Sequence, residues 1–167
     1  MQITEITPFG WRLPADSPFW RIAPRPIHLQ DVAYRERFDF RTIFYDLFLS
    51  PDERFAISVC PPLENLHQYI DKTNFFAMGP TGHAAPCEKV IDSLDRCTRI
   101  WFALPHGRKS AITSIGPLGK VTHPIGASYC SLFAGKKVLV TKSKNNQLDW
   151  ITDWININQS LHGINAL

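Results

Sequence analysis

Hydrophobic and polar positions follow two different patterns in this chain. Between residues 42 and 115, short runs of aromatic and β-branched residues are separated by turn residues, which is typical of short β-strands. After residue 130, one continuous apolar run is followed by apolar residues at helical spacing. The pattern therefore predicts several β-strands first and a strand followed by a helix at the end.

Two β-hairpins are predicted in the front part. In the first, residues 42–49 and 55–59 flank the tetrapeptide 50–53, Ser-Pro-Asp-Glu, which suits a type I turn with proline at its second position. In the second, residues 99–104 and 110–115 flank the turn-rich tetrapeptide Pro-His-Gly-Arg.

Other residues of the front part carry weaker signals. Leu63, Leu66 and Ile70 recur at helical spacing and predict one short helix between the hairpins. Residues 1–40 are rich in proline, tryptophan and arginine and match no regular element, so we expect them to wrap irregularly over the surface. Together these segments predict a small, mostly antiparallel β domain.

The distribution of proline predicts a boundary near residue 130. All thirteen prolines lie between Pro8 and Pro124, and none follows. Proline is excluded from helix interiors and from central strands, so its absence permits a helix and an interior strand in the last part. We therefore expect an α+β chain with a β-rich domain at 1–130 and a second unit at 131–167.

The second unit has the signals of a βαβ unit. Residues 137–141 suit a strand buried on both faces, and Asn145 or Asn146 is the expected N-cap of a helix. Gly163 is expected to end this helix, and residues 164–167 resume as the start of a second strand.

One face of the predicted helix is apolar, because Trp150, Trp154, Ile157 and Leu161 recur at i, i+4, i+7 and i+11. One helix on two strands cannot bury both tryptophans well. We therefore expect the chain to be a fragment, in which a missing C-terminal domain or a partner covers Trp150 and Trp154.

Composition excludes several classes of function. The net charge is only +3 and the basic residues are scattered, so no nucleic-acid partner is indicated. No apolar run approaches the roughly 18 residues of a transmembrane span, and the first residues lack the features of a signal peptide. The cysteines form no C-x-x-C pair and are expected to be reduced, mostly buried thiols of a cytoplasmic protein; they are Cys60, Cys87, Cys97 and Cys130.

No catalytic or metal-binding motif is complete in this sequence. The histidines form no H-E-x-x-H, no serine lies in G-x-S-x-G, and residues 79–82 lack the Lys-Ser/Thr ending of a phosphate loop. Tyr45, Trp101 and Phe102 could form a platform for carbohydrate, although aromatic residues in strands more often belong to the core.

The end of the chain resembles a known family. Residues 144–154, Lys-Asn-Asn-Gln-Leu-Asp-Trp-Ile-Thr-Asp-Trp, and residues 162–167, His-Gly-Ile-Asn-Ala-Leu, look like the opening of bacterial glycosyltransferases related to glycosyltransferase family 92. Residues 43–46 and 61–66 are similar to the β-rich segment that precedes the transferase domain in that group. The resemblance implies the nucleotide-diphospho-sugar fold called GT-A.

The resemblance also implies a function. Such an enzyme takes a nucleotide sugar and a carbohydrate acceptor in the synthesis of surface polysaccharide or lipopolysaccharide, and an acidic D-x-D late in the domain holds a divalent metal and the diphosphate. This sequence contains no Asp-x-Asp. We therefore expect an N-terminal portion that has no catalytic residues, metal ligands or cofactor of its own and is inactive alone.

The resemblance gives four candidates for nucleotide binding, Thr141, Lys142, Asn145 and Asn146. They follow the first predicted strand of the second unit, where open α/β sheets place their ligands. A helix cap and solvated lysines explain the same residues without a ligand. A second hypothesis for the whole chain is a non-catalytic, β-rich interaction module.

Overall fold

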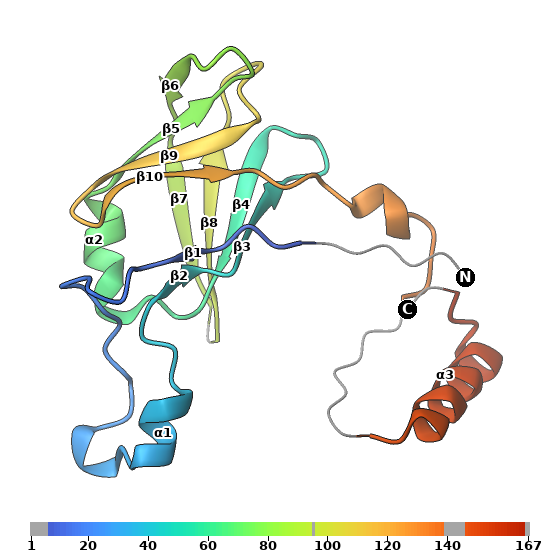
Figure 1. Ribbon diagram of the computed structural model, residues 1–167. Coiled ribbons are helices and arrows are strands. Elements are labelled where there is room, and N and C mark those ends of the chain that lie inside the picture. The colour runs from blue at the N-terminus through green and yellow to red at the C-terminus, as the bar shows by residue number, and fades with distance from the viewer. Residues whose placement is uncertain (1–6, 95, 139–145, 166–167) are drawn as a thin grey trace. The chain divides into compact units, whose positions relative to one another are not determined.

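The computed structural model describes residues 7–94, 96–138 and 146–165. The chain divides into two compact units, Met1–Ser128 and Tyr129–Leu167. The division falls two residues before the boundary that the proline distribution predicts. Antiparallel sheets make up most of the regular structure and helices the rest, so the α+β class is confirmed (Figure 1).

The strands of the first unit form two four-stranded sheets and one two-stranded ribbon, in which neighbouring strands are antiparallel. The first sheet has the order β3 (Asp46–Leu49), β4 (Phe55–Cys60), β8 (Thr98–Ala103) and β7 (Lys89–Ser93). The second has the order β10 (Gly119–Pro124), β9 (Ala111–Gly116), β5 (Asn74–Met78) and β6 (Ala84–Pro86). The ribbon pairs β1 (Trp11–Arg12) with β2 (Thr42–Phe44).

The helices are short, with one exception. The α-helices are α1 (Val32–Arg37), α2 (His67–Asp71) and α3 (Leu148–His162), and the 3-10 helices are η1 (Ile27–Leu29), η2 (Glu64–Leu66) and η3 (Cys130–Phe133).

Backbone hydrogen bonds connect the two four-stranded sheets at two corners. At one corner, Gly126 follows β10 and lies along β3: its N–H donates to the Leu47 carbonyl (2.8 Å) and its carbonyl accepts from Leu49 (2.9 Å). At the other, the Cys87 N–H donates to the Phe75 carbonyl (3.0 Å), which extends the β5–β6 pairing toward β7. The two sheets therefore enclose one core.

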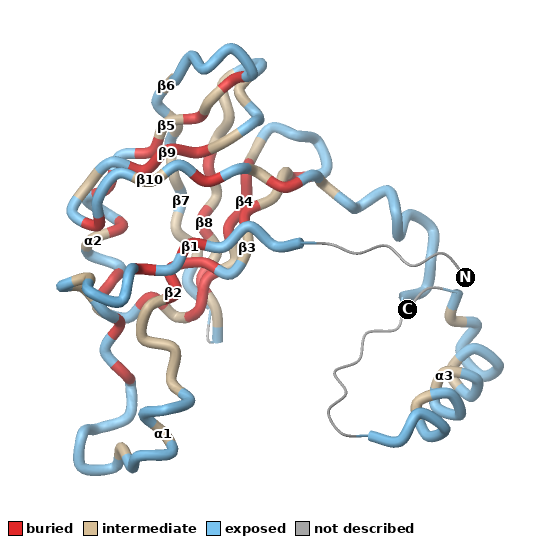
Figure 2. The backbone as a smooth tube through the Cα atoms, viewed as in Figure 1, coloured by how far each residue is buried: buried red, intermediate tan, exposed pale blue. Residues whose placement is uncertain are grey.

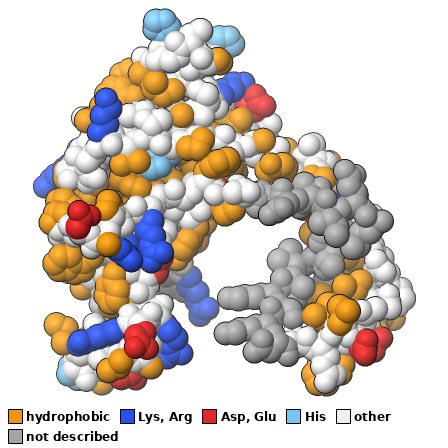
Figure 3. Space-filling model, viewed as in Figure 1, with side chains coloured by type: hydrophobic (Ala, Val, Ile, Leu, Met, Phe, Trp, Pro, Cys, Tyr) orange, Lys and Arg blue, Asp and Glu red, His pale blue; other side chains and the backbone are white. Residues whose placement is uncertain are grey.

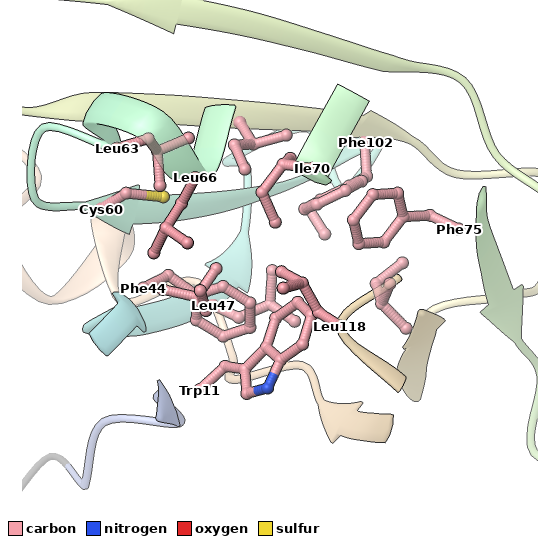
Figure 4. Close-up of a cluster of buried hydrophobic side chains, with 14 of the residues drawn as sticks. Trp11, Phe44, Leu47, Cys60, Leu63, Leu66, Ile70, Phe75, Phe102 and Leu118 are labelled. Carbon is pink, nitrogen blue, oxygen red and sulfur yellow. The ribbon is translucent and has the colours of Figure 1, made fainter. Parts of the chain in front are cut away.

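The core is built from alternate residues of the strands and is closed at one end by α2 (Figures 2 and 4). Along β8, Ile100 and Phe102 are buried while their neighbours are not. Leu66 and Ile70 are fully buried beneath the sheets, which confirms the short helix predicted from their spacing. Phe75 of the second sheet packs against Phe102 of the first, with ring centroids 4.8 Å apart.

The first predicted hairpin is confirmed. β3 and β4 pair directly, and the Glu53 N–H donates to the Ser50 carbonyl (2.9 Å) across the turn. The structure also corrects the expectation for residues 1–40, which contain β1, η1 and α1. Asp31 starts α1 as its N-cap and accepts the N–H of Tyr34 at 2.6 Å. This aspartate was the missed sequence signal, because Asp is a preferred N-cap residue.

The second predicted hairpin is wrong. β8 pairs with β4 and β7, whereas β9 pairs with β5 and β10, so the two strands belong to different sheets. The turn between them does form, and the Arg108 N–H donates to the Pro105 carbonyl (3.0 Å). Turn residues predict where a chain changes direction, but they do not determine which strands pair.

In the second unit, α3 ends at Gly163 as expected. This glycine has φ 62° and ψ 35°, the left-handed conformation in which glycine avoids steric strain. The expected N-cap is wrong for Asn146, because Gln147 is extended and occupies that position. Asn145 lies outside the described residues.

Most of the two strands predicted around α3 also lies outside the described residues. Where both segments are described, they lie side by side: the Lys137 N–H donates to the side-chain oxygen of Asn165 (2.9 Å), and the Asn165 N–H donates to the Lys137 carbonyl (3.2 Å). The described segments on either side of α3 therefore meet, and the βαβ unit itself stays a prediction.

His123 of β10 is buried against aromatic rings and has an exposed fraction of 5%. Its ring centroid lies 4.9 Å from that of Trp11 and 5.0 Å from that of Phe44. Its Nε2 has no hydrogen-bond partner among the described residues. Burial lowers the pKa of His123 from 6.5 to about 4, so the ring is neutral at neutral pH.

We expect acid to destabilise the first unit through His123. Because its pKa is lower in the folded than in the unfolded state, the unfolded chain binds more protons between about pH 6.5 and pH 4. The free energy of unfolding should be highest above this window and fall through it by up to about 3 kcal/mol. Urea unfolding between about pH 7.5 and pH 4.5 measures this loss.

The matched variant is His123→Leu, which removes the titrating ring. Its stability should change much less across the same window. An equal pH dependence in both proteins would show that another group is responsible. Asp39 and Asp52 contribute little in this range, because hydrogen bonds hold their pKa values below 3.8 even though burial opposes this shift.

Candidate functional site

The face of the first sheet that points away from the core carries large apolar side chains. Phe48, Ile57, Trp101 and Val90 occupy directly paired positions on four adjacent strands. Alternate residues of a strand point to opposite faces, and each of these four has a neighbour in or against the core: Leu47, Ala56, Ile100, Phe102 and Ile91. We call these four residues the outer apolar row.

Exposure along the outer apolar row increases toward the sheet edge. Ile57 in the middle has an exposed fraction of 8%, Phe48 and Trp101 are partly buried, and Val90 at the edge is 64% exposed. Phe55 adds a further ring beside the row, because it packs edge-on against Trp101 with centroids 6.0 Å apart and an interplanar angle of 85°. The row therefore combines partly exposed aromatic rings with aliphatic side chains on one face of the sheet.

A charged pair borders this surface. Arg99 and Asp92 are directly paired on β8 and β7, and both Nε (3.1 Å) and Nη2 of Arg99 donate to Oδ2 of Asp92. The Arg99 guanidinium lies 5.8 Å from the centroid of the Trp101 ring. The pair is partly exposed, so further hydrogen bonds can be made from its edge.

Such a surface suits a ligand with one apolar face and a polar rim. An aromatic ring attracts C–H groups through its negative face, and a pyranose ring offers C–H groups on its faces and hydroxyl groups at its rim. Arg99 and Asp92 supply the donors and acceptors for those hydroxyls. The chemistry of this surface is therefore compatible with a carbohydrate ligand.

The structure separates the three aromatic residues that the sequence suggested for such a platform. Trp101 belongs to the outer apolar row, whereas Phe102 is 1% exposed and lies in the core. Tyr45 lies between β2 and β3 and is half-exposed. Sequence reasoning missed Phe48 and Val90, because only the strand pairing shows that they extend the row.

Of the four residues expected beside a nucleotide, Thr141, Lys142 and Asn145 lie outside the described residues. Asn146 directly precedes Gln147, the N-cap of α3. The side chain of Gln147 makes no capping hydrogen bond. The expected nucleotide site therefore stays a prediction.

Neither the cysteines nor the potential metal ligands form a site among the described residues. All four cysteines are free, but only Cys60 is buried, so the expectation of mostly buried thiols is wrong. Burial raises the pKa of Cys60 and of Cys87 to about 11, which leaves both thiols protonated at neutral pH. Among the described residues, no cluster of His, Cys, Asp or Glu could hold a metal ion.

A cavity of about 370 Å³ lies between β5 and the chain that joins β6 to β7. Lys89 lines it, but its ammonium group donates to the carbonyls of Asp71 (2.8 Å) and Thr73 (2.9 Å), where the chain leaves α2. This lysine therefore ties α2 to the sheet and is not presented to a ligand. None of the described helices is both long enough and apolar enough to cross a membrane.

No protein-family model, curated protein or solved structure matches this chain. Fold and surface define a small antiparallel β module with an aromatic outer face, joined to a unit that contains one long helix. The relation to glycosyltransferases stays a prediction that rests on the residues quoted from the sequence.

Alanine substitutions can distinguish the core ring from the surface ring. Phe102→Ala should lower the free energy of unfolding by about 3 to 5 kcal/mol, because it leaves a cavity in the core. Trp101→Ala should cost about 1 kcal/mol, since it removes cross-strand contacts on a partly solvated face. Urea unfolding of both variants measures the two losses, and equal losses would place Trp101 in the core.

Proposed function

We propose that this chain is the non-catalytic, N-terminal part of a cytoplasmic, sugar-nucleotide-dependent glycosyltransferase of surface polysaccharide or lipopolysaccharide synthesis. In this proposal the first unit holds the carbohydrate acceptor on the outer apolar row. The observation that carries the proposal is the row itself, Phe48, Ile57, Trp101 and Val90, on a sheet face that would ordinarily be polar and solvated.

The dimensions of the row favour an extended ligand. Four adjacent strands are separated by three spacings of about 4.8 Å, so the row spans roughly 14 Å. Arg99 and Asp92 lie along one border of the row. An oligosaccharide can lie across such a strip with its ring faces on Trp101 and Phe55 and its hydroxyls toward the charged pair.

The second unit supports the donor half of the proposal. The hydrogen bonds between Lys137 and Asn165 bring the chain back along α3, as in the opening of a nucleotide-sugar domain. Thr141, Lys142, Asn145 and Asn146 would then border the nucleotide. The divalent metal and its acidic ligands would come from residues other than 1–167.

The exposed apolar face of α3 also supports the proposal that the chain is part of a larger protein. None of its residues is buried within the second unit, and one apolar row stays exposed. Ile151 and Ile155, about a quarter turn away around the helix, are partly covered. Further strands or a partner would cover the exposed row, which consists of Trp150, Trp154, Ile157 and Leu161.

The second candidate is the non-catalytic interaction module. Two observations favour it. The first unit has a core of its own, and its described residues contain no cluster that could hold a metal ion. In that case the outer apolar row would bind a protein. The two functions therefore differ in the ligand of one surface and can be separated by one experiment.

That experiment is affinity electrophoresis of the 167-residue chain in gels that contain bacterial surface polysaccharides. We expect retardation by at least one polysaccharide, and we expect Trp101→Ala to weaken binding by about tenfold or more, because it removes the central ring of the surface. The matched control is Trp20→Ala, which removes an exposed tryptophan outside the row and should bind as the unchanged chain does.

Binding that survives Trp101→Ala would contradict the proposed acceptor surface. A chain that binds no polysaccharide but recruits a protein through the same row would favour the interaction module. The reading frame after Leu167 tests the donor half independently. A downstream Asp-x-Asp supports the enzyme, and a stop codon with no such segment nearby supports the module.

A further inference from the structure

One segment of the first unit, residues 20–37, carries many exposed apolar side chains. We call this segment the α1 loop. Ten large hydrophobic side chains are exposed among the described residues of this unit. Half of them belong to a stretch of thirteen residues inside the α1 loop. They are Trp20, Ile22, Ile27, Leu29 and Val32. Large exposed apolar groups that cluster in this way mark interaction surfaces.

The α1 loop is anchored firmly at its base. The side chain of Asn65 accepts the Ile22 N–H (2.6 Å) and donates to the Trp20 carbonyl (3.1 Å). Arg21 is buried and donates to the carbonyls of Pro62 (3.3 Å) and Asp39. The loop therefore leaves the body of the unit at a fixed place, and Figure 1 shows that the segment with α1 extends away from the sheets.

The α1 loop is also ordered within itself. The Arg25 guanidinium lies 4.4 Å from the centroid of the Tyr34 ring, and the Gln30 side chain donates to the Arg25 carbonyl (2.5 Å). Asp31 caps α1. With these internal contacts formed, Ile27 and Val32 are still 77% and 72% exposed. Their exposure is therefore a property of the folded loop (Figure 2).

Arginines are interleaved with these apolar groups. Arg25, Arg35 and Arg37 are exposed, as are the two acidic residues between them, Asp31 and Glu36, so basic residues outnumber acidic ones on this surface. Figure 3 shows blue and orange side chains together with red acidic ones over the lower left of the molecule, where Figure 1 places α1. Apolar groups among arginines on a projecting loop suit the boundary between lipid headgroups and acyl chains.

We propose that the α1 loop docks the protein on the anionic surface of a lipid bilayer. Ile27, Leu29 and Val32 enter the headgroup boundary, and the exposed arginines meet the lipid phosphates. The exposed arginines beside exposed apolar side chains match the phosphates and the acyl chains of such a surface. The proposal is independent of the carbohydrate surface, which lies on the first sheet.

The test is co-sedimentation of the 167-residue chain with vesicles of phosphatidylglycerol and phosphatidylcholine, compared with vesicles of phosphatidylcholine alone. We expect binding to the anionic vesicles that weakens as salt is added. The double variant Ile27→Ser/Leu29→Ser should reduce the partition coefficient at least about tenfold, because several methyl and methylene groups no longer enter the bilayer. Arg35→Gln and Arg37→Gln should each reduce it by about fivefold.

The matched control is Leu94→Ser/Ile115→Ser, which removes two exposed apolar side chains far from the loop in sequence and should bind vesicles unchanged. Unaltered urea unfolding of each variant shows that the fold persists. Absence of vesicle binding, or full binding by the Ile27/Leu29 variant, overturns the proposal. So does competition by low concentrations of inorganic phosphate, which would indicate a phosphate site. Trp101→Ala should bind vesicles normally, so failure of the carbohydrate surface can be told apart from failure of this one.

Discussion

The pairing of β4 with β8 is the constraint on which the first unit depends. In the observed register, Ala56 lies opposite Phe102 and Ile57 lies opposite Trp101. Ala56 and Phe102 are both buried, and the Phe102 ring packs against Phe75 of the other sheet. A slip of one residue would turn Trp101 into the core and Phe102 out to solvent, because side chains alternate between the faces. One register thus determines both the core and the aromatic surface.

Local features of this fold could be predicted from the sequence, and long-range pairing could not. The first hairpin, the helix near Leu66 and the end of α3 at Gly163 depend on neighbouring residues, so turn, spacing and capping rules suffice. β4 and β8 lie about forty residues apart, and no local rule says that they meet. The second hairpin was wrong for this reason, since its strands pair elsewhere.

The same limit applies to the candidate site. Trp101 could be selected as an aromatic residue in a strand, but its placement opposite Ile57 and Val90 follows only from the pairing of β8 with β4 and β7. Sequence also grouped Trp101 with Phe102, although consecutive strand residues face opposite sides. The apolar face of α3 was visible in the sequence because helical periodicity is local. The exposure of the α1 loop was not, since nothing in its composition shows which side chains the fold leaves uncovered.

The packing of Trp11 over His123 links the N-terminal strand to the proton balance of the folded protein. β1 has only two residues, yet Trp11 is buried against both His123 and Phe44. Trp11 is therefore part of the apolar surroundings that keep water from the imidazole and lower the pKa of His123. A strand of two residues thus contributes to the linkage between protonation and folding, although it forms no part of either four-stranded sheet.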